Sequence, residues 1–153
     1  MTLRDRFDQL RAGNATADEL RALWLDASPV AVDAILGSWA GGDFANGHPA
    51  SAMLDQLRWH GKRFDAPLEA HPLICRDDTG ELYSETRAAG GGLASLWMIE
   101  VDGTPTATMV YDQMPVFDHF RAIDDDTLLG QMTGKLRAYF GTDEPYWFWL
   151  QRN

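Results

Sequence analysis

The residues best suited to acid–base chemistry lie in one stretch, where Tyr111 and Asp112 are followed closely by His119 and Arg121. A hairpin between these segments would bring Asp112 near the start of the second strand. A histidine exchanges protons near neutral pH, and a carboxylate could balance the arginine charge. We therefore take His119, Asp112 and Tyr111 as candidate catalytic residues for proton transfer, with Arg121 as a ligand anchor.

The strand expected around His119 leaves two interpretations open, because side chains alternate between the two faces of a strand. His119 and Arg121 would share one face, and Asp118 and Phe120 would share the other. A face that carries histidine and arginine among apolar residues is costly to bury without polar partners. It is either a polar anchor inside an apolar cavity or a network of ion pairs on an outer surface.

Two adjacent cations, Lys62 and Arg63, stand out in a chain with 13 Lys and Arg residues, 23 Asp and Glu residues and a net charge of −10. They could reach a ligand head group at the mouth of a cavity, or they could neutralise Asp65 and Glu69. Met and aromatic side chains, such as Trp59, suit an adaptable apolar lining. The predicted ligand-binding residues are Arg121, Lys62, Arg63, Trp59, Trp97 and Met109.

The remaining motifs predict no metal site and no cofactor. None of the four histidines has the spacing of a zinc site. His48 and His71 each precede a proline, which favours extended backbone, so we expect loop and cap hydrogen bonds from them. The chain has neither a Gly-x-Ser-x-Gly elbow nor a phosphate-binding loop. Cys75 lies in an apolar segment and is expected to be buried and structural.

Composition narrows the class of protein. A chain of 153 residues fits one domain, and a hydrophobic content of 45% excludes intrinsic disorder. The acidic balance argues against binding to nucleic acid or anionic lipid, since both require clustered basic residues. No apolar run is long enough to span a membrane, and the charged first residues exclude a secretory signal. We expect a cytoplasmic protein.

Two amphipathic helices are expected within residues 1–29, which we treat as a helical segment that packs on the rest of the domain. Apolar residues recur at helical spacing in the first helix. In the second helix, Thr16 and Glu19 have the spacing of a capping box.

The next segment changes character twice. A strand is expected over residues 30–38, where small and β-branched residues gather. A helix is expected over 49–58, because Pro49 suits a first helical position and apolar residues follow at helical spacing. Gly61 would then be its left-handed C-terminal cap.

From His71 onward the pattern predicts short antiparallel strands. The strongest hairpin signal is Asp102-Gly103, a pair that tolerates positive φ angles in a two-residue turn. About eight to ten strands would form a sandwich or a closed up-and-down barrel. Two segments, 93–101 and 146–150, are apolar on both faces, so we expect the N-terminal helices to cover an outer face. Strands are expected at 72–76, 81–88, 93–101, 106–111, 116–123, 128–133 and 146–152.

Several motifs carry a family resemblance. The chain resembles the GXWXG-domain family in three segments: Gly37-Ser38-Trp39-Ala40-Gly41, Gly47-His48-Pro49 and Trp59-His60-Gly61-Lys62-Arg63-Phe64. The domain of unknown function that usually follows it is similar in Ala107-Thr108-Met109-Val110-Tyr111-Asp112 and in the segment 115–121. The resemblance places the first part at about residues 30–77 and the second at about 81–153.

This resemblance implies a calycin-like β-barrel over residues 30–153, similar to lipocalins and fatty-acid-binding proteins, with a helix inserted after the first strand. The chain also resembles the calycin signature, in which an arginine of the last strand packs on a tryptophan near the start of the barrel. Here these residues would be Arg152 and Trp39. A cation over an indole ring gains ~0.5–2 kcal/mol, so the contact would close the barrel.

Three hypotheses for function follow. The first is the binding of a small hydrophobic ligand (a lipid, fatty acid, polyketide or terpenoid) in a barrel cavity. The second is a small cofactor-independent cyclase, isomerase or hydrolase that acts on such a ligand by acid–base catalysis. The third is a filled barrel that serves as a structural or oligomeric partner. The expected partner is a small hydrophobic molecule rather than nucleic acid or a membrane, and a homodimer is compatible with the sequence.

Overall fold

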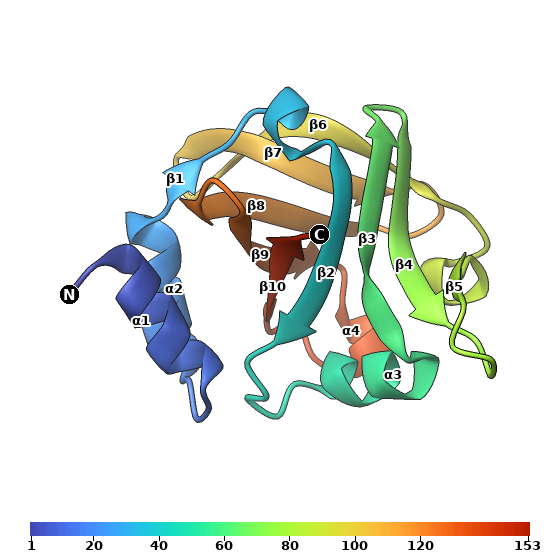
Figure 1. The fold of residues 1–153 in the computed structure, drawn as a ribbon, viewed down its shortest axis with the longest axis horizontal. Helices are drawn as coiled ribbons and strands as arrows, with labels where there is room; N and C mark the ends of the chain where they lie inside the picture. Colours follow the sequence, from blue (N-terminus) through green and yellow to red (C-terminus); the bar gives the residue numbers. More distant parts are fainter.

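Eight antiparallel strands close into a barrel in the computed structural model, which describes all 153 residues (Figure 1). The strands pair in chain order around the barrel, and the last strand returns to the first through the pairing of β10 with β2. The predicted mainly β, antiparallel barrel is confirmed. Its strands are β2 (Gly37–Asp43), β3 (Trp59–Ala66), β4 (Glu69–Arg76), β6 (Ala94–Val101), β7 (Thr104–Tyr111), β8 (Val116–Asp124), β9 (Thr127–Gly134) and β10 (Tyr146–Arg152).

Two shorter strands extend this sheet. β1 (Ser28–Pro29) pairs with the end of β8, and β5 (Leu82–Ser84) pairs with β4. The predicted Asp102-Gly103 hairpin joins β6 to β7, and both residues have positive φ angles, of 52° and 84°. Positive φ at both central positions matches the twist of the flanking strands, which is why this dipeptide fixes the register.

The N-terminal helices α1 (Leu3–Arg11) and α2 (Ala17–Asp26) pack on the outer face of the barrel, at one side in Figure 1. Both begin with a capping box, and the predicted pair of Thr16 and Glu19 forms one of them. Phe7 and Trp24 join a second hydrophobic core with Trp147 of β10. This cover explains why β10 is apolar on both faces.

β6 does not have such a cover, so the expectation for residues 93–101 is wrong on its outer face. Leu96 faces the core, but Trp97, on the opposite face, is 52% exposed. Met98 shares the face of Leu96 and is nevertheless 50% exposed. The helices cover β8, β9 and β10 instead, because their apolar residues contact Ile123, Leu129 and Trp147.

Two strand boundaries differ from the prediction. Residues 30–38 contain the 3₁₀ helix η1 (Val32–Ile35), and the first barrel strand begins only at Gly37. Residues 81–88 contain the three-residue β5 and then the 3₁₀ helix η2 (Arg87–Ala89). Composition favoured strands there, but the chain turns at both places to leave one strand and enter the next.

The inserted helix α3 (Pro49–Leu57) lies between β2 and β3, as expected. His48 caps it by accepting a hydrogen bond from the Ala50 amide, which confirms the expected cap. The left-handed C-cap is Arg58, with φ of 53°, and not Gly61. Gly61 instead lies in β3, where an added Cβ would stand 1.8 Å from the Trp39 carbonyl oxygen. The glycine therefore permits close approach of β3 to β2.

The expected contact between an arginine and a tryptophan is present where the barrel closes. The Arg152 guanidinium lies 4.1 Å from the Trp39 ring centroid, and the two residues pair across β2 and β10. Arg152 also donates hydrogen bonds to the carbonyls of Ala34 and Leu36. The contact ties the last strand to the segment that enters the first one.

The barrel interior is filled only in part. Phe64, Phe120 and Phe148 pack against one another across its middle, with ring centroids 5.7 and 6.0 Å apart. At one end, α3 and the short helix α4 (Arg137–Phe140) cover the barrel, and both contribute residues to the lining of its cavity (Figure 1). None of the helices is both long enough and apolar enough to cross a membrane.

Candidate functional site

A cavity of about 160 Å³ lies between the packed phenylalanines and the two closing helices. Of its 16 lining residues, 14 are hydrophobic. The helix α3 contributes Met53 and Leu54, and α4 contributes Tyr139 and Phe140. The two charged residues of the lining are Lys62 of β3 and Asp118 of β8.

Lys62 and Asp118 form an ion pair across the barrel interior, from strands that are not neighbours in the sheet. The Lys62 Nζ lies 2.9 Å from the Asp118 Oδ2, and the two side chains are only 4% and 2% exposed. Lys62 Nζ also donates to the Pro72 carbonyl at 3.1 Å. It lies 5.1 Å from the ring centroid of Phe148 and 5.6 Å from that of Trp59. The ammonium group therefore has two polar partners and two aromatic rings close to it.

Asp118 is less fully paired than Lys62. Its Oδ1 is buried and has no hydrogen-bond partner in the protein, although Oδ2 is bound to Lys62. Leaving a buried acceptor unsatisfied costs about 1–3 kcal/mol, and more when the group is charged. Asp118, a residue of the cavity lining, thus has one carboxylate oxygen without a hydrogen-bond donor.

Three tyrosines line the cavity, and the hydroxyls of the two buried ones, Tyr111 and Tyr146, stay protonated. Burial, and then the negative charge of Asp118, raise the pKa of Tyr111 well above its ordinary value. Burial and a hydrogen bond to Asp43 also raise the pKa of Tyr146. The Tyr146 hydroxyl is occupied, because it donates to Asp43 Oδ2 at 2.7 Å. No hydrogen bond within the protein engages the Tyr111 hydroxyl, which leaves it available to a bound molecule.

Three of the predicted site residues line this cavity: Tyr111, Trp59 and Lys62. Lys62 is buried deep in the barrel and does not lie at its mouth. Its neighbour Arg63 points to the outer face and pairs with Asp65 at 3.1 Å. Alternation along β3 separates the two cations: Arg63 neutralises Asp65 as one of the two interpretations expected, whereas Lys62 pairs with Asp118 inside the barrel.

His119 and Arg121 do not reach the cavity. His119 is 5% exposed and hydrogen-bonds Thr108 Oγ1 at 2.9 Å and Thr133 Oγ1 at 2.8 Å, on the outer face of β8. Burial lowers its pKa. Arg121 lies 4.6 Å from the Trp24 ring centroid and donates to the Trp24 carbonyl, so it anchors α2 to the barrel.

The other predicted residues are also placed elsewhere. Asp112 is exposed and forms no ion pair with Arg121, which corrects the expected pairing. Trp97 is on the outer face of β6 and donates to Ser95. Met109 is completely buried in the barrel core but does not line the cavity. Of the expected cluster, only Tyr111 faces the hollow part of the barrel.

Sequence reasoning missed Asp118 as a site residue. The alternation had placed it on one face with Phe120, and that face is the inward one. The observation that could have identified it is that a carboxylate and a lysine, far apart in the sequence, each lie among apolar residues of a strand. Buried charges require a partner, so Lys62 and Asp118 could have been paired on that ground.

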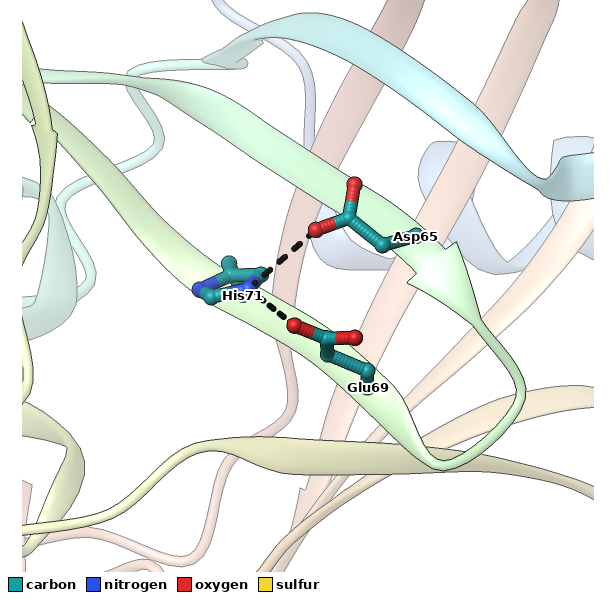
Figure 2. Close-up of side chains that lie close together, drawn as sticks. All are labelled: Asp65, Glu69 and His71. Atoms are coloured by element: carbon teal, nitrogen blue, oxygen red, sulfur yellow. Dashed lines mark ion pairs between the residues drawn. The ribbon is translucent and has the colours of Figure 1, made fainter.

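A separate polar cluster occupies the β3–β4 hairpin (Figure 2). His71 Nε2 lies 3.4 Å from Asp65 Oδ2 and 3.8 Å from Glu69 Oε1, while Nδ1 hydrogen-bonds Ser84. Such donors could hold a divalent cation, but Arg63 already supplies a positive charge to Asp65, and both carboxylates are solvent-exposed. We assign these contacts to the pairing of the two strands and assign no metal. His71 thus lies in a strand and not in the expected loop.

Cys75 lies in β4 and is fully buried in the barrel core. Burial raises the pKa of its thiol to about 11, so the reactive thiolate is scarce at neutral pH. The residue is structural, as expected.

Comparison with known proteins divides the chain into two parts. The family model described as "GXWXG protein" matches residues 22–80, so it begins within α2. The model described as "Domain of unknown function (DUF4334)" matches residues 92–152. The cavity is built from both parts, since Lys62 lies in the first and Asp118 in the second. Among curated proteins, none matches this chain.

A solved structure is similar over the full length. It is described as "Crystal structure of protein from Thermomonospora curvata" and is 34% identical to this chain. The match covers 100% of this chain and 99% of that chain, with a TM-score of 0.89.

Proposed function

We propose that this chain, which belongs to the family of proteins that join a GXWXG domain to a DUF4334 domain, binds a small hydrophobic molecule inside its barrel. The observation that carries the proposal is the apolar cavity of about 160 Å³. A dry cavity of about 150 Å³, lined by apolar side chains, is large enough to bind benzene. A ligand with one ring or a short branched chain would therefore fit, whereas a long acyl chain would have to protrude.

The cost of the cavity supports a role in binding. Space left unfilled in a core forgoes packing contacts, so leaving about 160 Å³ open is a cost in stability. Larger side chains at Ala50 or Ala88 would remove this cost. A barrel that served only as a structural partner would gain stability from such filling.

A calycin-like relationship is part of this proposal. It is supported by the contact of Arg152 with Trp39 and by the helix α3 between the first two barrel strands. Calycin-like barrels bind apolar molecules in their interior, and the partly filled interior of this barrel agrees with such a role.

The test uses methionine methyl groups as reporters. Met53, Met114 and Met132 line the cavity, whereas Met1 and Met98 are exposed elsewhere. In ¹³C-methyl NMR, titration with ethylbenzene should shift the three cavity signals and leave the two exposed ones in place. Shifts of Met98 without shifts of the cavity signals would contradict the proposal.

A matched pair of variants on one helix sharpens this test. Ala50→Phe should fill the cavity and abolish the shifts, because Ala50 is buried against it. Ala52→Phe introduces the same side chain at an exposed position of α3 and should bind like the parent protein. Thermal unfolding of both variants would show whether each one is folded.

The second candidate function is acid–base chemistry on the bound molecule. The observation that favours it is the unpaired Oδ1 of Asp118, which could accept a proton in a cavity of low polarity. His119, the base expected from the sequence, lies outside this cavity. The rate at which the α-hydrogens of cyclohexanone exchange with D₂O, followed by mass spectrometry, measures proton abstraction by such a base. Asp118→Asn should abolish any acceleration, and equal exchange with and without the protein would dismiss the enzyme.

A further inference from the structure

We infer that the cavity selects a neutral molecule that carries a hydroxyl group, an alcohol or a phenol, on a small apolar skeleton. This inference rests on the proposed function and names the chemical class of its ligand. It depends on which polar groups in the cavity wall have a partner and which do not.

The charge of the lysine is already compensated within the protein. Lys62 Nζ contacts Asp118 Oδ2 at 2.9 Å and the Pro72 carbonyl at 3.1 Å. Its remaining surface faces the rings of Trp59 and Phe148. An ammonium group has three N–H donors, of which Asp118 and the Pro72 carbonyl engage two, and the charge is already neutralised by Asp118. A ligand carboxylate would find no free cation here.

The carboxylate, by contrast, still requires a donor. Asp118 Oδ1 is buried without a hydrogen bond, on a side chain that is 2% exposed and lines the cavity. Hydrogen bonds to a charged acceptor are among the stronger ones in proteins. A ligand hydroxyl could donate to this oxygen and could also accept from the free hydroxyl of Tyr111, which lines the same cavity.

Charge balance excludes the other simple head groups. The ion pair of Lys62 with Asp118 is neutral as a unit, so an added carboxylate or ammonium would leave one uncompensated charge in an apolar site. A pure hydrocarbon avoids that cost but leaves Asp118 Oδ1 without a donor. A neutral hydroxyl group satisfies both conditions.

The experiment compares four probes with one skeleton: benzyl alcohol, ethylbenzene, benzoate and benzylamine. Their dissociation constants are measured by the cavity methionine signals in the full chain. Ethylbenzene leaves water more readily than the alcohol, so the informative quantity is the ratio of the two constants and how it changes when the ion pair is removed.

The decisive variant is the double substitution Lys62→Met with Asp118→Leu. It removes both charges together, which proteins often tolerate, whereas Asp118→Leu alone would leave Lys62 buried and unpaired. Relative to ethylbenzene, benzyl alcohol should lose about tenfold or more of its affinity in the double variant. Benzoate and benzylamine should bind the parent protein more weakly than benzyl alcohol.

The outcomes separate this inference from the proposed function. An equal alcohol-to-hydrocarbon ratio in parent and double variant would overturn the inference, while saturable binding of ethylbenzene would still support an apolar ligand. Tighter binding of benzoate than of benzyl alcohol would also overturn the inference and make Lys62 the anchor. If none of the four probes shifts the NMR signals of the cavity methionines, both the proposed function and the inference fail.

Discussion

The two faces of β8 differ in whether their polar groups lie beside a cavity. On the outer face, both ring nitrogens of His119 have threonine partners, and Arg121, whose Nε has no hydrogen-bond partner, is packed against the Trp24 ring and not beside a cavity. On the inner face, Val116 and Asp118 of the same strand line a cavity, and one carboxylate oxygen of Asp118 has no hydrogen-bond partner. A fully paired polar group contributes to stability, whereas an unpaired one is a cost that a ligand can offset. The difference suggests that the outer face supports the fold and the inner face supports binding.

The largest expected effect comes from breaking the inner ion pair on one side only. Lys62→Met leaves the Asp118 carboxylate buried without its cation, which should lower the free energy of unfolding by about 3–5 kcal/mol. Guanidinium denaturation of the single and double variants measures this directly. The double variant with Asp118→Leu should recover most of the loss. Equal stability of the single and double variants would show that the buried charge is not the cause.

A smaller effect is expected where Arg152 covers Trp39, a contact that does not line the cavity. Arg152→Ala removes a cation–π contact and two hydrogen bonds to carbonyls, so the loss should be about 1–3 kcal/mol. Thermal or chemical unfolding gives the stability, and the cavity methionine signals give the affinity for ethylbenzene. An affinity that falls along with the stability would break the division between supporting and binding faces.

The smallest effect concerns pH and the outer face. Because burial lowers the pKa of His119, the unfolded chain binds a proton near pH ~6.5 while the folded chain does not. The free energy of unfolding should therefore decrease as the pH falls through that range, and level off below the pKa of the folded state. His119→Gln should remove part of this decrease and leave ligand affinity unchanged.

A control for this pH dependence is His60, whose pKa is lowered by burial and then by Arg76. His60→Gln removes the other histidine of this kind. A pH profile that responds only to His60→Gln would assign the decrease to β3 and exclude His119.

Local signals predicted much of the fold. The capping box at Thr16 and Glu19 and the Asp102-Gly103 turn depend on few neighbouring residues, and both form as expected. The Arg152–Trp39 contact came from the family resemblance, since nothing local relates residues so far apart. Glycines were harder to interpret, because Gly61 serves close strand approach and not a helix end.

The candidate site was harder to predict because both faces of β8 are buried. Alternation separated Asp118 from His119 correctly but could not indicate which face lines the barrel. An outer face under solvent would have been polar and therefore recognisable. Here α1 and α2 cover that side of the barrel, and Arg121 is buried against Trp24. The choice of His119 as an inward residue followed from its chemistry and not from its position.

The closure of one barrel end by α3 and α4 has a consequence for how fast a molecule can enter. His48 caps α3 through Nδ1 and contacts the Glu144 carbonyl oxygen through Nε2 at 3.0 Å, so one side chain ties α3 to the segment that follows α4. Met53 and Phe140 of these helices line the cavity. Because the two helices border the cavity, any movement that parts them and widens its entrance should speed both the entry and the release of a molecule.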